Sequence, residues 1–140
     1  MKMQHVKSAN DLTLAAAQDL LIKGLEHARD RDLKLAIAVV DRAGNLLAFA
    51  RMDGAPIVTA DVAIGKARTA AHLQAPSKLF EDMINSGAPS MATVPGLLPL
   101  QGGMPVLFGD EVIGAIGTSG SSGENDQSVA TWIAGAFEQD

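Results

Sequence analysis

Five residues of this chain have types and positions that could form a polar ligand site: Arg51, Asp53, Lys66, Gly102 and Gly103. Arg51 and Asp53 end an apolar run, and side chains two apart in a strand lie on the same face. Lys66 follows on the next helical segment, and two cations beside a glycine bend can hold a carboxylate. A structural ion pair, Arg51–Asp53 or Asp53–Lys66, explains the same residues equally well. If the chain is an enzyme, these three charged side chains are its candidate catalytic groups.

The stretch VIGAIGTSG (residues 112–120) places three glycines inside what otherwise reads as a buried strand. Glycine in a strand interior costs about 0.5–1 kcal/mol relative to alanine, so close approach of other atoms must require it. Gly114 and Gly117 point to opposite faces of the sheet. One of these glycines can let a helix pack closely against the strand, while the other faces a ligand or another subunit. Alternatively, tight packing and a β-bulge account for both glycines without a ligand. We therefore predict a ligand pocket between this strand and the GGMP bend, lined by Arg51, Asp53, Lys66, Gly102, Gly103, Pro105, Gly114, Gly117 and Ser119.

Other candidate sites in the sequence have plainer explanations. Glu81 and Asp82 are adjacent on a helix and diverge by about 100°, so they predict a solvated face and no metal site. The segment GTSGSSGEND could bind an anion at a helix N-terminus, but its own carboxylates already complement that end. We predict that Asp126 caps the helix. Ser119 and Ser121 have no histidine base placed beside them by the sequence.

Composition excludes several classes of protein. A chain of 140 residues fits one domain, here 1–140, and 47% hydrophobic residues supply a core. A net charge of −5 with no basic run argues against nucleic-acid binding. The apolar stretches are too short to span a membrane, and no signal peptide is recognised, so we expect a cytoplasmic protein. Without cysteine there are no disulfides and no thiolate chemistry.

Hydrophobic periodicity predicts the elements that position these residues. The first half of the chain is predicted to form helix 13–29 capped by Thr13, strands 34–41 and 46–52, and helix 59–74 capped by Thr59. A short helix from Ser77 and an ordered loop over 87–105, with one short strand near GLLPLQGG, follow. The chain then forms two strands within 105–120, which turn at Gly109-Asp110, and ends in helix 125–138. About four residues join the first two strands, too few for a parallel crossover. The order predicts an α+β fold: helices packed on one antiparallel sheet.

Three blocks of sequence together resemble the GlcG/HbpS family, also called the haem-degrading or DUF336 domain. They are AVVDRAGNLLAFARMDGA (38–55), GKARTAA (65–71) and GGMPV (102–106) with the glycine strand and Asp126. The same domain forms the C-terminal part of PduO-type corrinoid adenosyltransferases. The resemblance implies a profilin-like fold that assembles into dimers, tetramers or octamers.

The resemblance also implies a class of ligand, because some members of the family bind haem. We therefore predict a small-ligand binding protein that holds haem, a similar bulky cofactor or a carboxylated metabolite. An enzyme or accessory protein of a catabolic pathway is the alternative: haem degradation, or glycolate, propanediol or aromatic metabolism. His72, just after KARTAA, is the first candidate for a haem ligand. His27, near a helix end where a cation suits the dipole, is the second, and His5 lies near the terminus.

Overall fold

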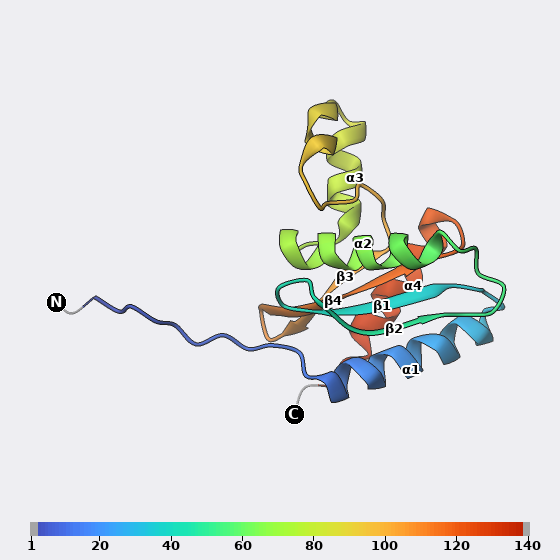
Figure 1. Ribbon diagram of the computed structural model, residues 1–140, viewed down its shortest axis with the longest axis horizontal. Helices are drawn as coiled ribbons and strands as arrows, with labels where there is room; N and C mark the ends of the chain where they lie inside the picture. The colour runs from blue at the N-terminus through green and yellow to red at the C-terminus, as the bar shows by residue number, and fades with distance from the viewer. Residues whose placement is uncertain (1–2, 139–140) are drawn as a thin grey trace.

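The protein is a four-stranded antiparallel sheet with helices on both faces (Figure 1). The computed structural model describes residues 3–138. The elements are α1 (Leu14–Asp30), β1 (Ala36–Asp41), β2 (Leu46–Arg51), α2 (Thr59–Leu73), α3 (Ser77–Asn85), the 3-10 helix η1 (Pro89–Thr93), β3 (Gly103–Phe108), β4 (Glu111–Ser119) and α4 (Gly123–Gly135). The strands lie in the order β2-β1-β4-β3, and the predicted α+β class is confirmed.

Each face of the sheet buries residues of a different size. Small residues of α2 face small residues of β1 and β4, among them Ala63, Ala67, Ala36, Ala38 and Ala115. On the opposite face, larger residues of α1 and α4 pack against larger residues of the sheet. They include Leu20 and Ile133 from the helices and Ile37, Val39 and Ile116 from the strands. Small side chains let α2 lie close to the strands, and β1 is buried on both sides, as the consecutive valines of that strand predict.

Thr13 caps α1 as predicted, accepting a hydrogen bond from the Ala16 amide at 3.1 Å. Four other details of the predicted elements differ in the structure. Thr59, however, is the first residue of α2, and its hydroxyl donates to the Pro56 carbonyl instead of capping the helix. GLLPLQGG forms no strand before Gly103, η1 lies within the predicted loop, and α4 runs two to three residues earlier than expected.

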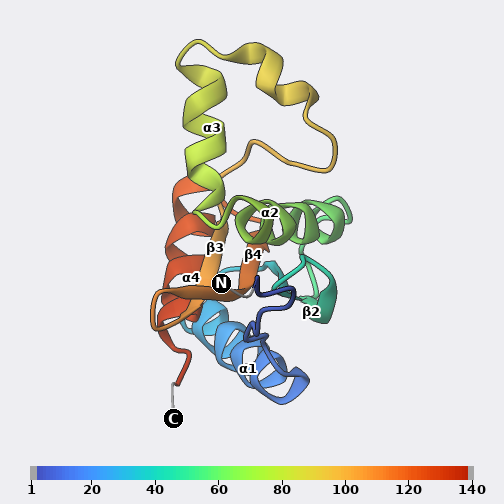
Figure 2. The same cartoon turned by 90° about the vertical axis from the view of Figure 1, so that its left-hand side faces the viewer.

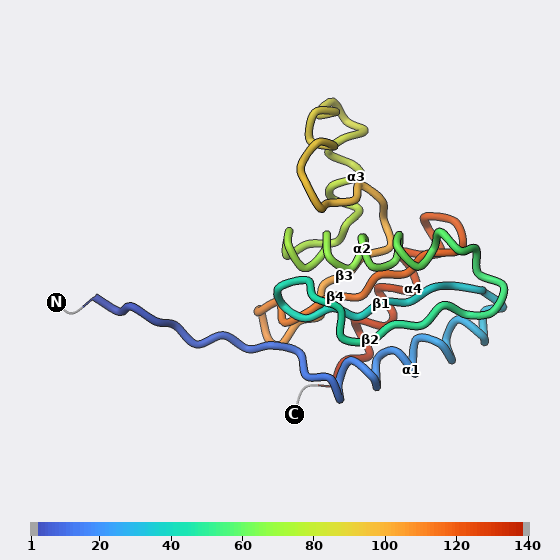
Figure 3. The backbone as a smooth tube through the Cα atoms, viewed as in Figure 1, coloured from blue at the N-terminus to red at the C-terminus, as the bar shows by residue number. Residues whose placement is uncertain are grey.

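Residues 77–101, which we call the arm, project from the α2 side of the sheet (Figures 1 and 2). The arm consists of α3, η1 and the segment that returns to β3, and the tube in Figure 3 traces this excursion as one loop away from the body. Phe80 is buried at 1% exposure. The first helix of the arm therefore contributes a fully buried apolar side chain.

Candidate functional site

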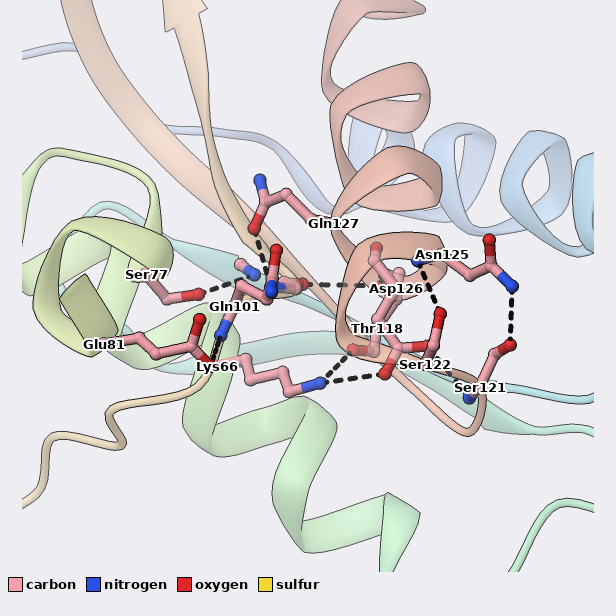
Figure 4. Close-up of polar contacts among 12 residues, drawn as sticks. Lys66, Ser77, Glu81, Gln101, Thr118, Ser121, Ser122, Asn125, Asp126 and Gln127 are labelled. Carbon is pink, nitrogen blue, oxygen red and sulfur yellow. Dashed lines mark hydrogen bonds and ion pairs between the residues drawn. The ribbon is translucent and has the colours of Figure 1, made fainter. Parts of the chain in front are cut away.

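Lys66 lies in the middle of α2 and is 3% exposed. Its ammonium group donates to the Thr118 carbonyl at 2.9 Å and to Asp126 Oδ2 at 3.1 Å (Figure 4). Asp126, also 3% exposed, accepts a further hydrogen bond from the Ser121 amide through Oδ1 at 3.0 Å. A buried charge must be paired and hydrogen-bonded to be tolerated. This ion pair therefore joins α2, β4 and α4 in the interior.

The GGMP bend wraps around Lys66. A Cβ added at Gly102 would lie 2.8 Å from Lys66 Nζ, and φ at this glycine is +124°. A Cβ added at Gly103 would meet the Lys66 backbone carbonyl. The Gly102 amide donates to Gln127 Oε1 at 2.7 Å, and the Gly103 amide donates to Ser77 Oγ at 2.8 Å. The lysine and its helix fill the space that a side chain would need at either glycine.

The glycine strand is also explained by close packing against other parts of the chain. A Cβ at Gly117 would meet the Ala63 carbonyl oxygen, so this glycine admits α2. Gly114, on the opposite face, lies under Leu12, with the Val40 carbonyl oxygen 2.6 Å from the added Cβ. The two glycines do face opposite sides, as predicted. Protein atoms occupy both sides, however, so the glycines themselves point to no ligand pocket.

Three further candidates occupy positions that the sequence did not predict. Ser122, and not Asp126, caps α4, accepting from the Asn125 amide at 3.1 Å. Asp126 is one turn inside the helix and points toward Lys66 (Figure 4). Ser119 is buried at 7% exposure at the end of β4. Pro105 lines an apolar hollow of about 320 Å³ between β3 and α4.

Arg51 and Asp53 lie elsewhere, on a cavity of about 440 Å³ between the C-terminal end of α1 and the end of β2. Three more charged side chains line it: Arg29, Asp32 and Lys34. None of these three was predicted as a site residue from the sequence. The strand register was the signal that could have found them, because antiparallel pairing sets Ala36 opposite Arg51 and so brings the charged run before β1 beside the end of β2. The structure thus separates Arg51 and Asp53 from Lys66.

The charged side chains around this cavity are largely unpaired. Arg51 Nη1 donates to the Ala55 carbonyl at 2.9 Å. In the described chain, no ion pair joins any cation of the cavity to Asp32 or Asp53. The stem of Lys34 lies on Gly54, where an added Cβ would be 2.7 Å from Lys34 Cδ. Leu25, Leu33, Ala50 and Met52 supply apolar walls, so the arrangement suits a ligand with both an apolar body and a negative charge.

The histidines lie away from this cavity. His72 is exposed near the C-terminal end of α2, and its Nε2 lies 2.8 Å from the Ala43 carbonyl in the turn between β1 and β2. That turn is the opposite end of the hairpin from the cavity. His27 stacks on Trp132 of α4, with ring centroids 4.0 Å apart. Between residues 3 and 138, no three His, Asp or Glu side chains are grouped to hold a metal ion.

The His27–Trp132 stack allows a direct test of the environment of His27. Burial lowers the pKa of His27 below 6.5, and the nearby Arg31 lowers it further while Asp30 acts in the opposite direction. Because Trp132 is the single tryptophan, we expect its fluorescence to change on acidification with a midpoint below pH 6.5. The lowered pKa means that the folded state binds the His27 proton less tightly than the unfolded state does. Neutral His27 therefore contributes to the free energy of unfolding above pH 6.5, and this contribution is lost as the pH falls below that value.

His27→Gln should abolish the fluorescence transition, and the control His72→Gln should leave it unchanged. A midpoint above the ordinary histidine pKa, or a transition that persists in His27→Gln, would contradict the stacked and desolvated geometry.

Comparison with known proteins gives a consistent family assignment. The family model described as "Haem degrading protein HbpS-like" matches residues 12–134. Protein GlcG of Escherichia coli (strain K12) is 39% identical over 108 residues, which cover 77% of this chain and 81% of GlcG.

Two solved structures share the fold. A double mutant of HbpS from Streptomyces reticuli superposes with a TM-score of 0.89 and 32% identity, covering 99% of this chain and 95% of that one. The PduOC:heme complex superposes with a TM-score of 0.82 and 23% identity, covering 91% of this chain and 96% of that one. At this identity the likeness establishes a shared fold and nothing more. Every helix within residues 3–138 is too short or too polar to span a lipid bilayer.

Proposed function

Because the chain belongs to the HbpS-like family, we propose that it binds haem or another bulky ligand with carboxylate groups in the cavity at the end of α1 and β2. The observation that carries this proposal is the group of three cations, Arg29, Lys34 and Arg51, around one cavity and without a carboxylate partner in the described chain. A volume of about 440 Å³ falls within the range of small-molecule sites.

The charges of the cavity suit an anionic ligand. Three cations stand against two carboxylates, Asp32 and Asp53, so an excess of positive charge remains. The whole chain carries −5, so this cavity is a place where a negatively charged ligand gains attraction that the rest of the surface opposes. Arginine in particular binds a carboxylate through two parallel hydrogen bonds.

The edge of haem that carries the propionates suits this combination of charged and apolar groups. Arg29, Lys34 and Arg51 would hold propionates, and Leu25 and Leu33 would lie against the macrocycle. Met52 contributes a sulfur to the lining, although its Sδ already accepts the Leu35 amide at 3.4 Å. When bound, haem would supply a redox-active iron. The PduOC:heme complex, with the same fold, supports haem as the first ligand to test.

A second candidate function is an enzyme or accessory protein acting on a small organic acid, since the same cations would orient a carboxylate substrate. Of the three predicted catalytic candidates, Arg51 and Asp53 reach the cavity, whereas Lys66 is held by Asp126 in the interior. We further propose that the chain acts in the cytoplasm as a homo-oligomer; the absence of cysteine suits a reducing compartment.

Hemin titration tests the ligand proposal. We expect a shifted Soret band that saturates at one equivalent per chain, and Arg29→Gln or Arg51→Gln should each raise the hemin Kd by about tenfold, because one charge-assisted contact is lost. Arg68→Gln is the matched control, since Arg68 lies on α2 outside the cavity.

His72→Ala separates this cavity from the site that the sequence predicts. Haem bound between α1 and β2 is beyond the reach of His72, so we expect the Soret shift to persist in this variant. Loss of the shift in His72→Ala, with normal binding in Arg51→Gln, would place haem elsewhere. If wild type shows no shift, haem is not the ligand, and the same variants can be titrated with small organic acids.

A further inference from the structure

Asp32 follows the C-terminal end of α1 in a conformation that residues with a Cβ adopt only at a cost. Its φ is +54°, in the left-handed region. The Asp32 amide donates to the Arg29 carbonyl at 2.9 Å, and the Leu33 amide donates to the Ala28 carbonyl at 2.9 Å. These are the two hydrogen bonds of a Schellman motif, in which glycine is the usual left-handed residue. The backbone at this position therefore favours glycine over aspartate.

The charge of Asp32 is also unfavourable for α1. The C-terminal end of a helix carries partial negative charge, so cations stabilise it and carboxylates do not. The last turn of α1 has the cation that suits it, Arg29, and a histidine, His27. In the described chain no ion pair includes Asp32. Neither the backbone nor the electrostatics of the helix end accounts for an aspartate here.

The cavity between α1 and β2 gives the carboxylate of Asp32 a possible use. Asp32 lines this cavity together with the cations Arg29, Lys34 and Arg51. An ionised carboxylate only accepts hydrogen bonds, and its strongest partners are cationic donors. The cations suit the carboxylate of a ligand, and Asp32 suits an ammonium group on the same ligand. The wall of the cavity is therefore complementary to a molecule that carries both charges.

We propose that Asp32 determines the specificity of this cavity by favouring α-amino acids with an apolar side chain. The ligand carboxylate binds Arg29 or Arg51, the ligand ammonium group donates to Asp32, and Leu25 contacts the apolar side chain. The inference rests on the proposed function in one respect, because it requires that the cations hold a carboxylate. Haem uses the cations alone, so hemin binding tests the cavity and not the role of Asp32.

Isothermal titration calorimetry at pH 7 with three ligands of similar shape tests the proposal. Phenylalanine, phenyllactate and hydrocinnamate share a ring and a carboxylate, and they carry an ammonium group, a hydroxyl group or neither beside it. We expect wild type to bind phenylalanine most tightly and hydrocinnamate least tightly. In Asp32→Gly the Kd of phenylalanine should rise about tenfold, because a charge-assisted hydrogen bond is lost. The Kd of hydrocinnamate should stay the same or fall, because a like charge is removed.

Two variants outside the cavity control for backbone and charge. Gln74 follows α2 with φ +53°, and the Gln74 and Ala75 amides donate to the Ala71 and Ala70 carbonyls in the same pattern. Gln74→Gly and Asp32→Gly should both leave the thermal midpoint equal or higher, because glycine adopts this conformation without strain. Asp30→Asn removes a neighbouring charge that does not line the cavity. Gln74→Gly and Asp30→Asn should leave the preference for phenylalanine unchanged.

The outcomes separate this inference from the proposed function. The inference is overturned if wild type does not bind phenylalanine, if it does not prefer phenylalanine to hydrocinnamate, or if Asp32→Gly keeps that preference. If Arg51→Gln weakens the binding of all three ligands while Asp32→Gly has no effect, the cavity holds the carboxylate and only the role of Asp32 is wrong. If Arg51→Gln affects neither these ligands nor hemin, the proposed site itself is wrong.

Discussion

Replacing Lys66 by methionine is expected to lower the free energy of unfolding by about 3–5 kcal/mol, because it leaves Asp126 as an unpaired charge in the interior. Methionine has a similar length and no charge, so the loss reports the broken ion pair and not a large cavity. The hydrogen bond to the Thr118 carbonyl is lost as well. Urea unfolding followed by circular dichroism measures the change.

Two variants control this experiment. Lys78→Met breaks an exposed pair with Asp82 and should cost no more than about 1 kcal/mol. In Lys66→Met/Asp126→Asn the charge left behind is also removed, while the amide oxygen can still accept the Ser121 amide, so much of the stability should return. If Lys66→Met and Lys78→Met cost the same, the buried pair does not hold the three elements together.

The expected loss of stability also limits what a Lys66 variant can say about catalysis. Lost turnover in such a variant would follow from unfolding as readily as from a missing catalytic group. Arg51→Gln and Asp53→Asn, at the cavity, are the informative variants for an enzyme, because both residues are exposed and do not hold the core.

Gly117→Ala is expected to destabilise the protein by about 3 kcal/mol or more, at the upper end of the cost of overpacking a core. The new Cβ would meet the Ala63 carbonyl oxygen and lie 2.6 Å from the Ala67 amide nitrogen. Both are backbone atoms of α2, so no side-chain rotation can relieve the contact. Relief requires the helix to move away from the sheet, which opens the packing of small residues along that face.

Gly135→Ala is the matched control for Gly117→Ala, and it should not destabilise the protein. Gly135 is the last residue of α4, and nothing lies within 4 Å of an added Cβ. Alanine is favoured over glycine in a helix by about 1 kcal/mol, so this variant should be neutral or stabilising. Equal thermal midpoints for wild type and Gly117→Ala would show that the glycine is not required by α2.

The secondary-structure elements and the fold class could be predicted from the amino-acid sequence. Periodicity located the helices and hairpins because each depends on residues close along the chain, as Thr13 and the consecutive valines of β1 illustrate. The resemblance to the GlcG/HbpS family rested on three such blocks, and the family is confirmed. Two of the errors fell at helix starts: Thr59 donates to the neighbouring Pro56 carbonyl instead of capping α2, and Asp126 pairs with Lys66, a partner far along the chain.

The roles of the charged residues depend on how the helices and strands pack against one another. Lys66 and Asp126 are both compatible with a site or a cap in the sequence, and their pairing across three elements follows from how α2 and α4 pack on the sheet. The register of β1 and β2 likewise brought Arg29 and Lys34 to Arg51, and set Lys66 apart. Such partners are far apart along the chain, and local patterning carries no information on which of them will meet.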